Sequence, residues 1–471
     1  MKRTKIVATL GPASSSDENL MALLRAGVDV FRVNFSHGDP EDHRKLIQRI
    51  RKLLDENQWT AAILADLQGP KLRIGVVEEG AEVHPGDTIT FTNHPCEGTS
   101  QRVYMTYQDF PKDVKPGDRI LLDDGKLLMT VLSTNGVDEV VAKVVQGGPL
   151  KSKKGVNLPN TRVSLPCLTD KDLIDLRVAL EEDVEWIGLS FVRSAEDIKV
   201  LRTLLKQSNS HAGIVAKIEK PEAVADIDRI LAATDAVMVA RGDLGVEIPA
   251  ESVPLVQKML TRKAMLLSKP VIVATQMMET MIESLTPTRA EVNDVANAVL
   301  DGADAVMLSG ETSVGKYPIE VVETMARIIR HAEASKWVKA PKNPPKKESS
   351  RFLTDTICYQ AAKMADALEA KAIVTMTFSG YTAERIASHR PASSVFVFTS
   401  NRRILNKLNL FWGVRCFFYD KMVSTDDTFS DVKAILKANQ CVFPGNTLIT
   451  IASMPIEARG TTNMLKVSVV D

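Results

Sequence analysis

Short apolar runs alternate with segments of helical period through the first two thirds of the chain. Each run is nearly continuous in aliphatic residues, which is typical of strands buried on both faces of a parallel sheet. One segment of helical length lies between most of the runs, and the segment after Thr288 carries Glu291 three residues on, a capping-box signature. The runs number eight, at residues 4–11, 28–36, 61–68, 184–191, 212–219, 235–243, 269–276 and 303–311.

Eight strand–helix units predict a (β/α)8 TIM barrel of the α/β class. A doubly wound open sheet is the competing architecture, because it is also built from parallel strands and intervening helices.

One connection interrupts this alternation after the third predicted strand. About a hundred residues there read as β-structure, with the turn-forming sequence Pro-Gly-Asp at Pro85 and again at Pro116. The segments "DDG" and "NG" predict hairpin turns. We therefore expect an inserted all-β, β-barrel-like domain over residues 71–164, and the barrel over residues 1–70 and 165–337.

A segment rich in Pro and Lys, residues 338–351, follows the eighth unit and predicts a linker. Beyond it a second alternation begins, with five strand-like runs separated by helical patterns. This indicates a separate C-terminal α/β domain over residues 352–471.

Composition narrows the class of protein. The 471 residues include 59 Lys plus Arg and 59 Asp plus Glu, so the formal net charge is zero and gives no general attraction to nucleic acid or membranes. The five cysteines show no paired spacing, which favours a reducing compartment over a disulfide framework or a structural zinc site. No apolar run reaches the roughly 18 residues that span a membrane. We expect a cytoplasmic enzyme with no nucleic-acid or membrane partner.

Polar and charged residues gather at the C-terminal ends of six predicted strands, where TIM barrels carry their active sites. Residues two apart on a strand share a face, so Lys217 should lie beside Glu219, and Arg241 beside Asp243. A ring of structural ion pairs could explain one such pair, but the whole set favours a functional site. The residues concerned are Arg32, Asn34, Ser36, His37, Asp66, Lys217, Glu219, Arg241, Asp243, Thr275, Gln276, Ser309, Gly310 and Glu311.

These residue types suit chemistry on a phosphorylated substrate. Glu219 and Asp243 can hold Mg²⁺, which takes one or two carboxylates and completes its shell with water and phosphate oxygens. Lys217, with Arg32 and Arg73, can neutralise charge on a transferring phosphoryl group. The residue between Arg241 and Asp243 is a glycine, which lets a ligand approach the backbone, and a helix after it would aim N–H groups at an anion.

The motifs that carry these residues resemble the pyruvate kinase family. The likeness extends from the first strand to the linker, and the final 120 residues match the family in architecture more than in sequence. The matching segments are RVNFSHG (32–38), GPKLR (69–73), KKGVNLP (153–159), AKIEKPE (216–222), VMVARGDLGVEIP (237–249), VATQMMETM (273–281) and residues 287–318.

The resemblance implies phosphoryl transfer from phosphoenolpyruvate to ADP, giving pyruvate and ATP with Mg²⁺ or Mn²⁺ as cofactor. Glu219 and Asp243 then correspond to the metal ligands, and Lys217 to the residue that stabilises the phosphoryl group and the enolate oxygen. Arg32 corresponds to the phosphate-binding arginine. Gly242 and Asp243, through backbone N–H, and Thr275 correspond to the site of the substrate carboxylate, and Thr275 also to the point of enolate protonation.

Further positions carry over for the nucleotide, namely Asn34, His37, Arg73 and Lys154. Because Lys154 belongs to the inserted domain, we expect that domain (the lid domain below) to close over the nucleotide and exclude water.

One departure concerns the monovalent cation. Many family members read DTKGPEIR where this chain reads DLQGPKLR, so that Lys71 replaces a glutamate that helps to create a K⁺ site. The remaining K⁺ positions correspond to Asn34, Ser36, Asp66 and the Leu67 carbonyl. A lysine ammonium has the charge of K⁺ and can act as a tethered substitute, so we expect no K⁺ requirement.

The C-terminal domain and the assembly are less constrained. The segment TFSGYTAER, residues 377–385, could form a phosphate nest for a sugar-phosphate or nucleotide effector, or simply a helix N-cap with a Gly turn. The family's tryptophan and arginine effector segment is not evident in ASMPIEARGTTNMLKV. Family resemblance implies a homotetramer.

The alternative functions are a metal-dependent enolate lyase or aldolase on the same barrel, and a non-catalytic binding protein that retains the fold.

Overall fold

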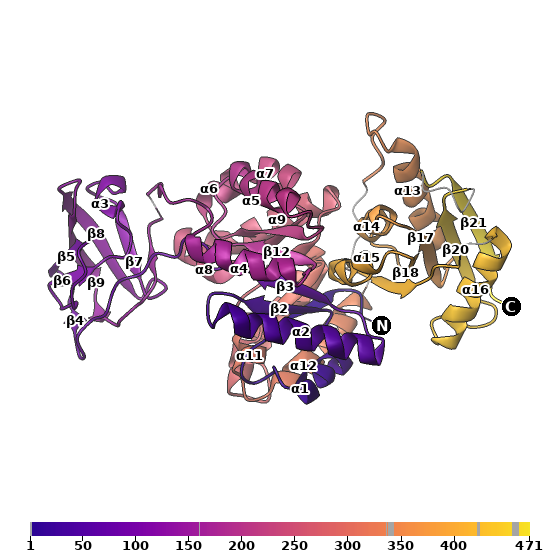
Figure 1. The fold of residues 1–471 in the computed structure, drawn as a ribbon, viewed down its shortest axis with the longest axis horizontal. Coiled ribbons are helices and arrows are strands. Elements are labelled where there is room, and N and C mark those ends of the chain that lie inside the picture. The colour runs from indigo at the N-terminus through magenta and orange to yellow at the C-terminus, as the bar shows by residue number, and fades with distance from the viewer. Residues whose placement is uncertain (1, 160, 336, 338–342, 422–423, 455–460) are drawn as a thin grey trace.

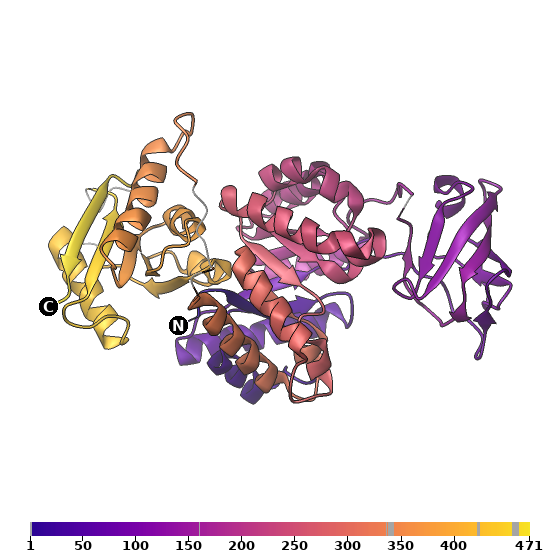
Figure 2. The same ribbon diagram turned by 180° about the vertical axis from the view of Figure 1, so that it is seen from behind.

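Three bodies follow one another in the computed structural model (Figure 1). The lid domain lies at one end, the barrel in the middle and the C-terminal domain at the other end, and the view from behind shows the same order (Figure 2). The structure describes residues 1–471 except 1, 160, 336, 338–342, 422–423 and 455–460. Parts of the predicted linker (338–342) and of the segment compared with the family's effector loop (455–460) therefore lie outside the described residues.

The central sheet is a closed barrel of eight parallel strands in the order β1-β16-β15-β14-β13-β12-β3-β2. Each predicted apolar run contains one of these strands, so the barrel prediction is confirmed and the open doubly wound sheet is wrong. The strands are β1 (Lys5–Thr9), β2 (Val30–Asn34), β3 (Ala62–Asp66), β12 (Trp186–Leu189), β13 (Gly213–Ile218), β14 (Ala236–Ala240), β15 (Val271–Ala274) and β16 (Ala305–Leu308).

Helices surround this sheet and bury one apolar face each against it. The Thr288–Glu291 capping box is present, with the Thr288 side chain accepting from the Glu291 N–H and the Glu291 side chain accepting in return. The outer helices are α1 (Asp17–Ala26), α2 (Pro40–Asn57), α4 (Asp170–Glu181), α5 (Ala195–Gln207), α6 (Pro221–Ala225), α7 (Ile227–Ala233), α9 (Val253–Leu266), α10 (Arg289–Asp301) and α12 (Pro318–Glu333). Two short helices, α8 (Arg241–Glu247) and α11 (Gly310–Ser313), follow strands at the barrel mouth directly.

The lid domain carries its own apolar core and a six-stranded sheet in the order β11-β7-β8-β9-β5-β6. Its "DDG" and "NG" segments are hairpin turns, with positive φ at Gly125 and Gly136. Its elements are β4 (Glu82–Val83), β5 (Thr88–Thr92), β6 (Arg102–Tyr104), α3 (Phe110–Asp113), β7 (Arg119–Leu122), β8 (Leu127–Thr134), β9 (Glu139–Gln146), β10 (Gly148–Pro149) and β11 (Val156–Asn157).

The C-terminal domain has a five-stranded sheet in the order β19-β18-β17-β20-β21, with only β21 antiparallel to its neighbour. All five predicted strands are present, whereas the precise domain boundaries stay predictions. The elements are α13 (Phe352–Ala367), β17 (Ala372–Met376), α14 (Tyr381–Ser388), β18 (Ser394–Thr399), α15 (Arg402–Lys407), β19 (Val414–Phe418), α16 (Thr425–Ala438), β20 (Thr447–Ala452) and β21 (Met464–Val469).

The C-terminal domain packs on the end of the barrel where the strands begin. The Trp186 ring at the start of β12 lies 6.2 Å from that of Phe411, which makes the core inside the barrel continuous with that of the C-terminal domain. A Cβ on Gly213 would lie 2.4 Å from the Trp186 ring, so only glycine fits beside it. Asp304, just before β16, binds the buried Arg390 guanidinium through both oxygens, at 3.0 and 2.8 Å.

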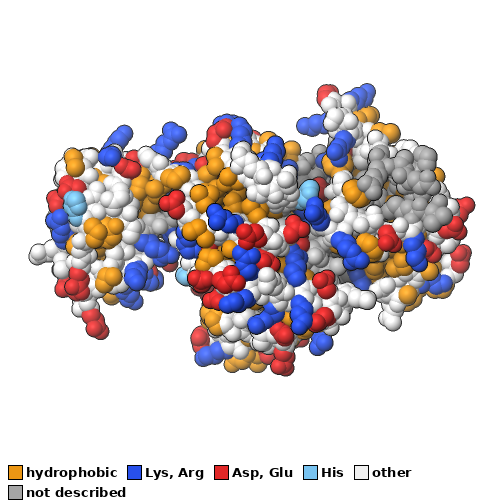
Figure 3. All heavy atoms as spheres, viewed as in Figure 1, with side chains coloured by type: hydrophobic (Ala, Val, Ile, Leu, Met, Phe, Trp, Pro, Cys, Tyr) orange, Lys and Arg blue, Asp and Glu red, His pale blue; other side chains and the backbone are white. Residues whose placement is uncertain are grey.

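Charged side chains of both signs are interspersed over the face shown in Figure 3. In the described part of the chain, no helix combines the length and the apolar character needed to cross a bilayer.

The Asp304–Arg390 pair gives a test of the contact between barrel and C-terminal domain. We expect Asp304→Ala to lower the free energy of unfolding by about 3–5 kcal/mol, because a buried guanidinium loses its carboxylate. Asp42→Ala removes one partner of the exposed Asp42–Lys45 pair and should change the free energy of unfolding by less than about 1 kcal/mol. Urea unfolding monitored by circular dichroism measures both, and equal effects of the two substitutions would contradict the prediction.

Candidate active site

A lysine enclosed by acidic and hydroxyl groups lies at the C-terminal mouth of the barrel. The Lys217 Nζ lies 3.3 Å from Asp66 Oδ1 and 3.0 Å from Glu219 Oε1, and it donates to the Ser190 hydroxyl at 2.6 Å. Asp66 also accepts from Arg32 Nε at 2.7 Å. Lys217 on β13 and Glu219, directly after its end, thus lie on one side, as predicted from their spacing.

Burial and mutual charge set the protonation of this group. Only 12% of the Lys217 side chain and 1% of the Glu219 side chain are exposed. Burial works to lower the pKa of Lys217, but the charges of Asp66 and Glu219 outweigh it and raise that pKa. Burial works to raise the pKa of Asp66, but the positive charges of Lys217 and Arg32 outweigh it and lower that pKa. Its carboxylate neighbours therefore favour the charged form of the Lys217 side chain despite its burial.

The two carboxylates predicted to bind the metal, Glu219 and Asp243, interact with each other. The pKa of Glu219 is raised, chiefly by burial, against the effect of Lys217, and the charge of Asp243 raises it further. Glu219 Oε2 accepts the Phe191 N–H at 2.7 Å, which orients the carboxylate. Two carboxylates that repel each other at the barrel mouth are the donor set that a hard divalent cation such as Mg²⁺ relieves. Among the described residues no cluster of three or more His, Cys, Asp or Glu offers another metal site.

The prediction that Arg241 and Asp243 share a strand face is wrong. β14 ends at Ala240, and Arg241 begins α8, so the helix starts before the GDLG sequence rather than after it. The Arg241 guanidinium instead donates to Asp294 at 2.6 Å and to the Thr275 carbonyl at 2.7 Å. Arg241 therefore holds the end of β15 in place, while Asp243 lies in the first turn of α8.

The glycine between these two residues brings the backbone close to a hydroxyl. The Gly242 N–H donates to Thr275 Oγ1 at 2.7 Å, and a Cβ on Gly242 would lie 3.4 Å from that oxygen. Thr275 has a φ of 70°, in the left-handed region that non-glycine residues rarely adopt. The structure thus brings Gly242 and Thr275 together beside Asp243, as the sequence predicts for one subsite.

The predicted nucleotide residues are divided between barrel and lid domain. Asn34, at the end of β2, accepts the Ser36 N–H at 3.2 Å, and the His37 carbonyl is 2.8 Å from His43 Nε2. On the lid side, Arg73 donates to the Lys153 carbonyl at 3.1 Å, and Lys154 pairs with Asp123 at 2.9 Å. Within the described residues, no hydrogen bond or ion pair joins the barrel pair Asn34 and His37 to the lid pair Arg73 and Lys154.

The structure places the Lys71 ammonium beside Asp243. Its Nζ lies 3.7 Å from Asp243 Oδ1, and 31% of its side chain is exposed. The Leu67 carbonyl accepts from the Ser190 hydroxyl at 2.7 Å. Within the described residues, no hydrogen bond or ion pair connects Lys71 with Asn34, Ser36, Asp66 or Leu67. Whether K⁺ is required stays a prediction.

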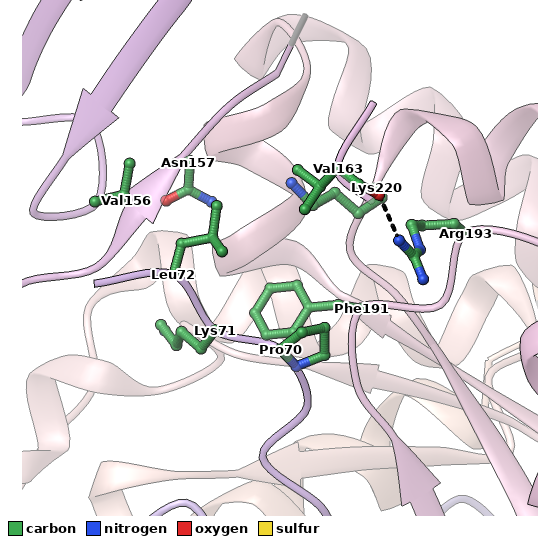
Figure 4. A pocket seen from close by; sticks show the side chains of 9 residues that line it. All are labelled: Pro70, Lys71, Leu72, Val156, Asn157, Val163, Phe191, Arg193 and Lys220. Carbon is green, nitrogen blue, oxygen red and sulfur yellow. Dashed lines mark hydrogen bonds between the residues drawn. The ribbon is translucent and has the colours of Figure 1, made fainter. Parts of the chain in front are cut away.

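Two short segments connect the lid domain to the barrel and border a pocket (Figure 4). Asn157, on the returning segment, donates to Glu247 at 2.8 Å, and the same Glu247 oxygen accepts from Lys220 at 2.5 Å. Arg193 donates to the Val163 carbonyl at 2.7 Å, the bond drawn in Figure 4. The lid domain is thereby anchored to α8 through Glu247 and to Arg193, which follows β12.

Sequence reasoning missed two residues of this site. Ser190 follows the fourth barrel strand and accepts from Lys217, and its place as the last residue of GLS, at the end of an apolar run, was a usable signal. Glu247 lies at the end of α8, and only the fold reveals its contacts with Asn157 and Lys220.

Comparisons with family models, with related sequences and with solved structures all match this chain to the same family. The family model described as the pyruvate kinase barrel domain matches residues 1–322, and the one described as the pyruvate kinase alpha/beta domain matches residues 355–468. The chain is 47% identical to a pyruvate kinase of Corynebacterium glutamicum, over 99% of this chain and 97% of that one. It is 44% identical to a pyruvate kinase of Mycobacterium tuberculosis, over 99% of this chain and 98% of that one. A solved pyruvate kinase structure from Cryptosporidium parvum superposes with a TM-score of 0.92 at 34% identity, covering 100% of this chain and 96% of that one.

The electrostatic link between Glu219 and Asp243 is testable without any bound metal. Asp243→Asn removes a like charge, so the pKa of Glu219 should fall. Infrared titration of the carboxyl C=O band in metal-free protein measures this, with Glu219→Gln used to assign the band. The link is refuted if the Glu219 titration is the same in Asp243→Asn as in the parent protein.

Proposed function

The chain belongs to the pyruvate kinase family, which transfers the phosphoryl group of phosphoenolpyruvate to ADP, and we propose the following roles for its residues in that reaction. The observation that carries the proposal is the buried Lys217 ammonium between Asp66, Glu219 and Ser190. It supplies a fixed positive charge at the point where the phosphoryl group leaves the enolate oxygen.

Lys217 and Arg32 neutralise the phosphoryl oxygens and the developing enolate from the protein side. Asp66 keeps both cations in place, because its two oxygens contact one each. Glu219 and Asp243 hold the Mg²⁺ or Mn²⁺ ion, which when bound neutralises negative charge on substrate oxygens.

The substrate carboxylate occupies the Gly242–Thr275 region. The Asp243 N–H can donate a hydrogen bond to this anion. The Gly242 N–H, which donates to the Thr275 hydroxyl in the structure, can do so in exchange for that bond. The Thr275 hydroxyl donates to the Ala274 carbonyl at 2.6 Å, so it is oriented at the edge of the site. From there it positions the proton that the enolate takes up through water.

The nucleotide lies between the mouth and the lid domain. Asn34 and His37 contact it from the barrel, and Arg73 and Lys154 from the lid domain, so that domain closure completes the phosphate-binding set and excludes water. The Asn157–Glu247 and Arg193–Val163 contacts supply the anchored hinge for this motion.

We further propose a cytoplasmic homotetramer that responds to a phosphorylated effector. Exposed apolar side chains on the edge strand β21, Val467 and Val469, support association of C-terminal sheets. The turn over Thr377–Gly380 supports the phosphate nest, since α14 starts after Gly380, which has no side chain to cap the helix, and only a long 3.5 Å bond joins the Tyr381 N–H to the Ser379 hydroxyl.

A substitution of the central lysine tests the proposed roles. Lys217→Met should lower kcat for pyruvate formation from phosphoenolpyruvate and ADP by at least about 10²-fold, because a preorganised charge at the transferring group is lost. A coupled pyruvate assay with and without Mg²⁺ measures this, and circular dichroism checks the fold. Lys206→Met, at an exposed position on α5, is the matched control and should retain full activity. Unchanged steady-state behaviour in Lys217→Met would reject the proposal.

The cation prediction has its own test in Lys71. The parent enzyme should turn over equally well in K⁺, Na⁺ and tetramethylammonium buffers, because Lys71 supplies the monovalent charge. Lys71→Glu should acquire stimulation by K⁺, whereas Lys115→Glu, at an exposed lid position, should not. Strong K⁺ stimulation of the parent enzyme would show that Lys71 does not replace the ion.

A further inference from the structure

A buried carboxylate at the end of α8 lies one helical turn from a proposed metal ligand. Glu247 is the last residue of α8, and Asp243 comes four residues earlier on the same helix. Residues four apart lie on one face of an α-helix. The Glu247 side chain is only 1% exposed, so its contacts form in surroundings that hold almost no solvent. The contacts that fix Glu247 therefore also bear on the position of Asp243.

One oxygen of this carboxylate binds donors from two other segments. Lys220, directly after Glu219, donates from Nζ to Glu247 Oε1 at 2.5 Å. The side-chain amide of Asn157 donates to the same oxygen at 2.8 Å, and both donor residues are drawn in Figure 4. Glu247 thus connects the helix that carries Asp243 with the backbone that carries Glu219.

The donor Asn157 is part of the lid domain's own sheet. It lies on β11, where it pairs with Leu121 of β7, and the preceding Val156 packs in the lid core. Only 9% of Asn157 is exposed. A movement of the lid domain therefore either shifts the Asn157 amide relative to Glu247 or carries Glu247 with it.

The helix that joins these residues has little stability of its own. α8 has seven residues, of which Gly242 and Gly245 are glycines, and no side chain caps its N-terminus. A glycine inside a helix costs about 1 kcal/mol relative to alanine, and isolated helices shorter than about 12 residues are marginal in water. The position of α8 therefore depends on the packing of its buried side chains, Leu244 and Glu247.

The second oxygen of Glu247 leaves room for a stronger contact. Oε2 is buried and accepts no hydrogen bond from the described residues, which is unusual for a buried polar atom. The Asn157 amide carries two N–H groups and the Lys220 ammonium three, so either can supply a further donor. A small movement of the lid domain can thus add to the bonds that hold the end of α8.

We propose that Glu247 is a positioning residue through which the lid domain sets the separation of Glu219 and Asp243, and with it the affinity for the divalent cation. The inference rests on the proposed metal role of these two carboxylates. The Asn157–Glu247–Lys220 contacts hold the carboxylates at one separation while the lid domain is docked on α8. Loss of that docking lets α8 shift. Metal binding and lid docking then favour each other, because coupling between two sites is reciprocal.

The affinity of the substrate-free, full-length protein for Mn²⁺ tests the inference, with free Mn²⁺ measured by electron paramagnetic resonance. Asn157→Ala changes no charge and lies outside the barrel, yet it should raise the Mn²⁺ dissociation constant about five- to tenfold. Lys220→Met should also raise that constant, whereas electrostatics alone predicts tighter binding once a nearby positive charge is removed. Glu251→Gln, at an exposed position shortly after α8, should bind Mn²⁺ like the parent protein.

Hydrogen exchange gives a second readout that needs no metal. In metal-free Asn157→Ala the amides of α8 should exchange faster than in the parent protein, because the helix has lost a contact at its last residue. Glu251→Gln should leave this exchange unchanged. Parental protection of α12 in each variant confirms that the barrel is folded, and Asn157→Ala decides the matter alone if Lys220→Met does not fold.

Three results would overturn the inference and show that Glu247 only fastens the lid domain. They are an unchanged Mn²⁺ dissociation constant in Asn157→Ala, unchanged α8 exchange in that variant, and tighter Mn²⁺ binding in folded Lys220→Met. A failure of the proposed metal site is recognised separately. In that case Glu219→Gln and Asp243→Asn bind Mn²⁺ as the parent protein does, and the inference falls with the site.

Discussion

The contact on which the active site depends is that of the Lys217 ammonium with Asp66 and Glu219. One cation is held by two carboxylates that are each only 1% exposed, and Asp66 shares its other oxygen with Arg32. Each charge would be prohibitive alone at this depth, so the group is stable only as a set. The same arrangement leaves the mouth preorganised for negative charge, because the cations are fixed before any substrate arrives.

The two ends of the barrel have different tasks. The C-terminal ends of the strands carry the residues proposed for catalysis, and the short helix α8 links Asp243 in its first turn to the lid anchor Glu247 in its last. The other end carries the stabilising Asp304–Arg390 pair and the contact of Trp186 with Phe411. One seven-residue helix thus joins a proposed metal ligand to the lid domain, while the C-terminal domain is fixed at the far end of the barrel.

Much of this architecture could be predicted from the sequence. Continuous apolar runs identified all eight barrel strands, and strand alternation identified the Lys217–Glu219 pair. The failure at Arg241 has a physical cause: its partner Asp294 is 53 residues away, and local sequence does not show that the strand ends at Ala240. Glu247 likewise has its partners, Asn157 and Lys220, on other segments. Lys71 was recognised as a departure, but its place beside Asp243 required the fold.

The most direct test of the account is a crystal structure of the enzyme with Mn²⁺ and phosphoenolpyruvate, in which anomalous scattering locates the ion. The account predicts one ion at the barrel mouth, bound by an oxygen of Glu219 and an oxygen of Asp243, with the Lys217 ammonium on the phosphoryl side. An ion held by only one of these carboxylates, or located away from both, would contradict it.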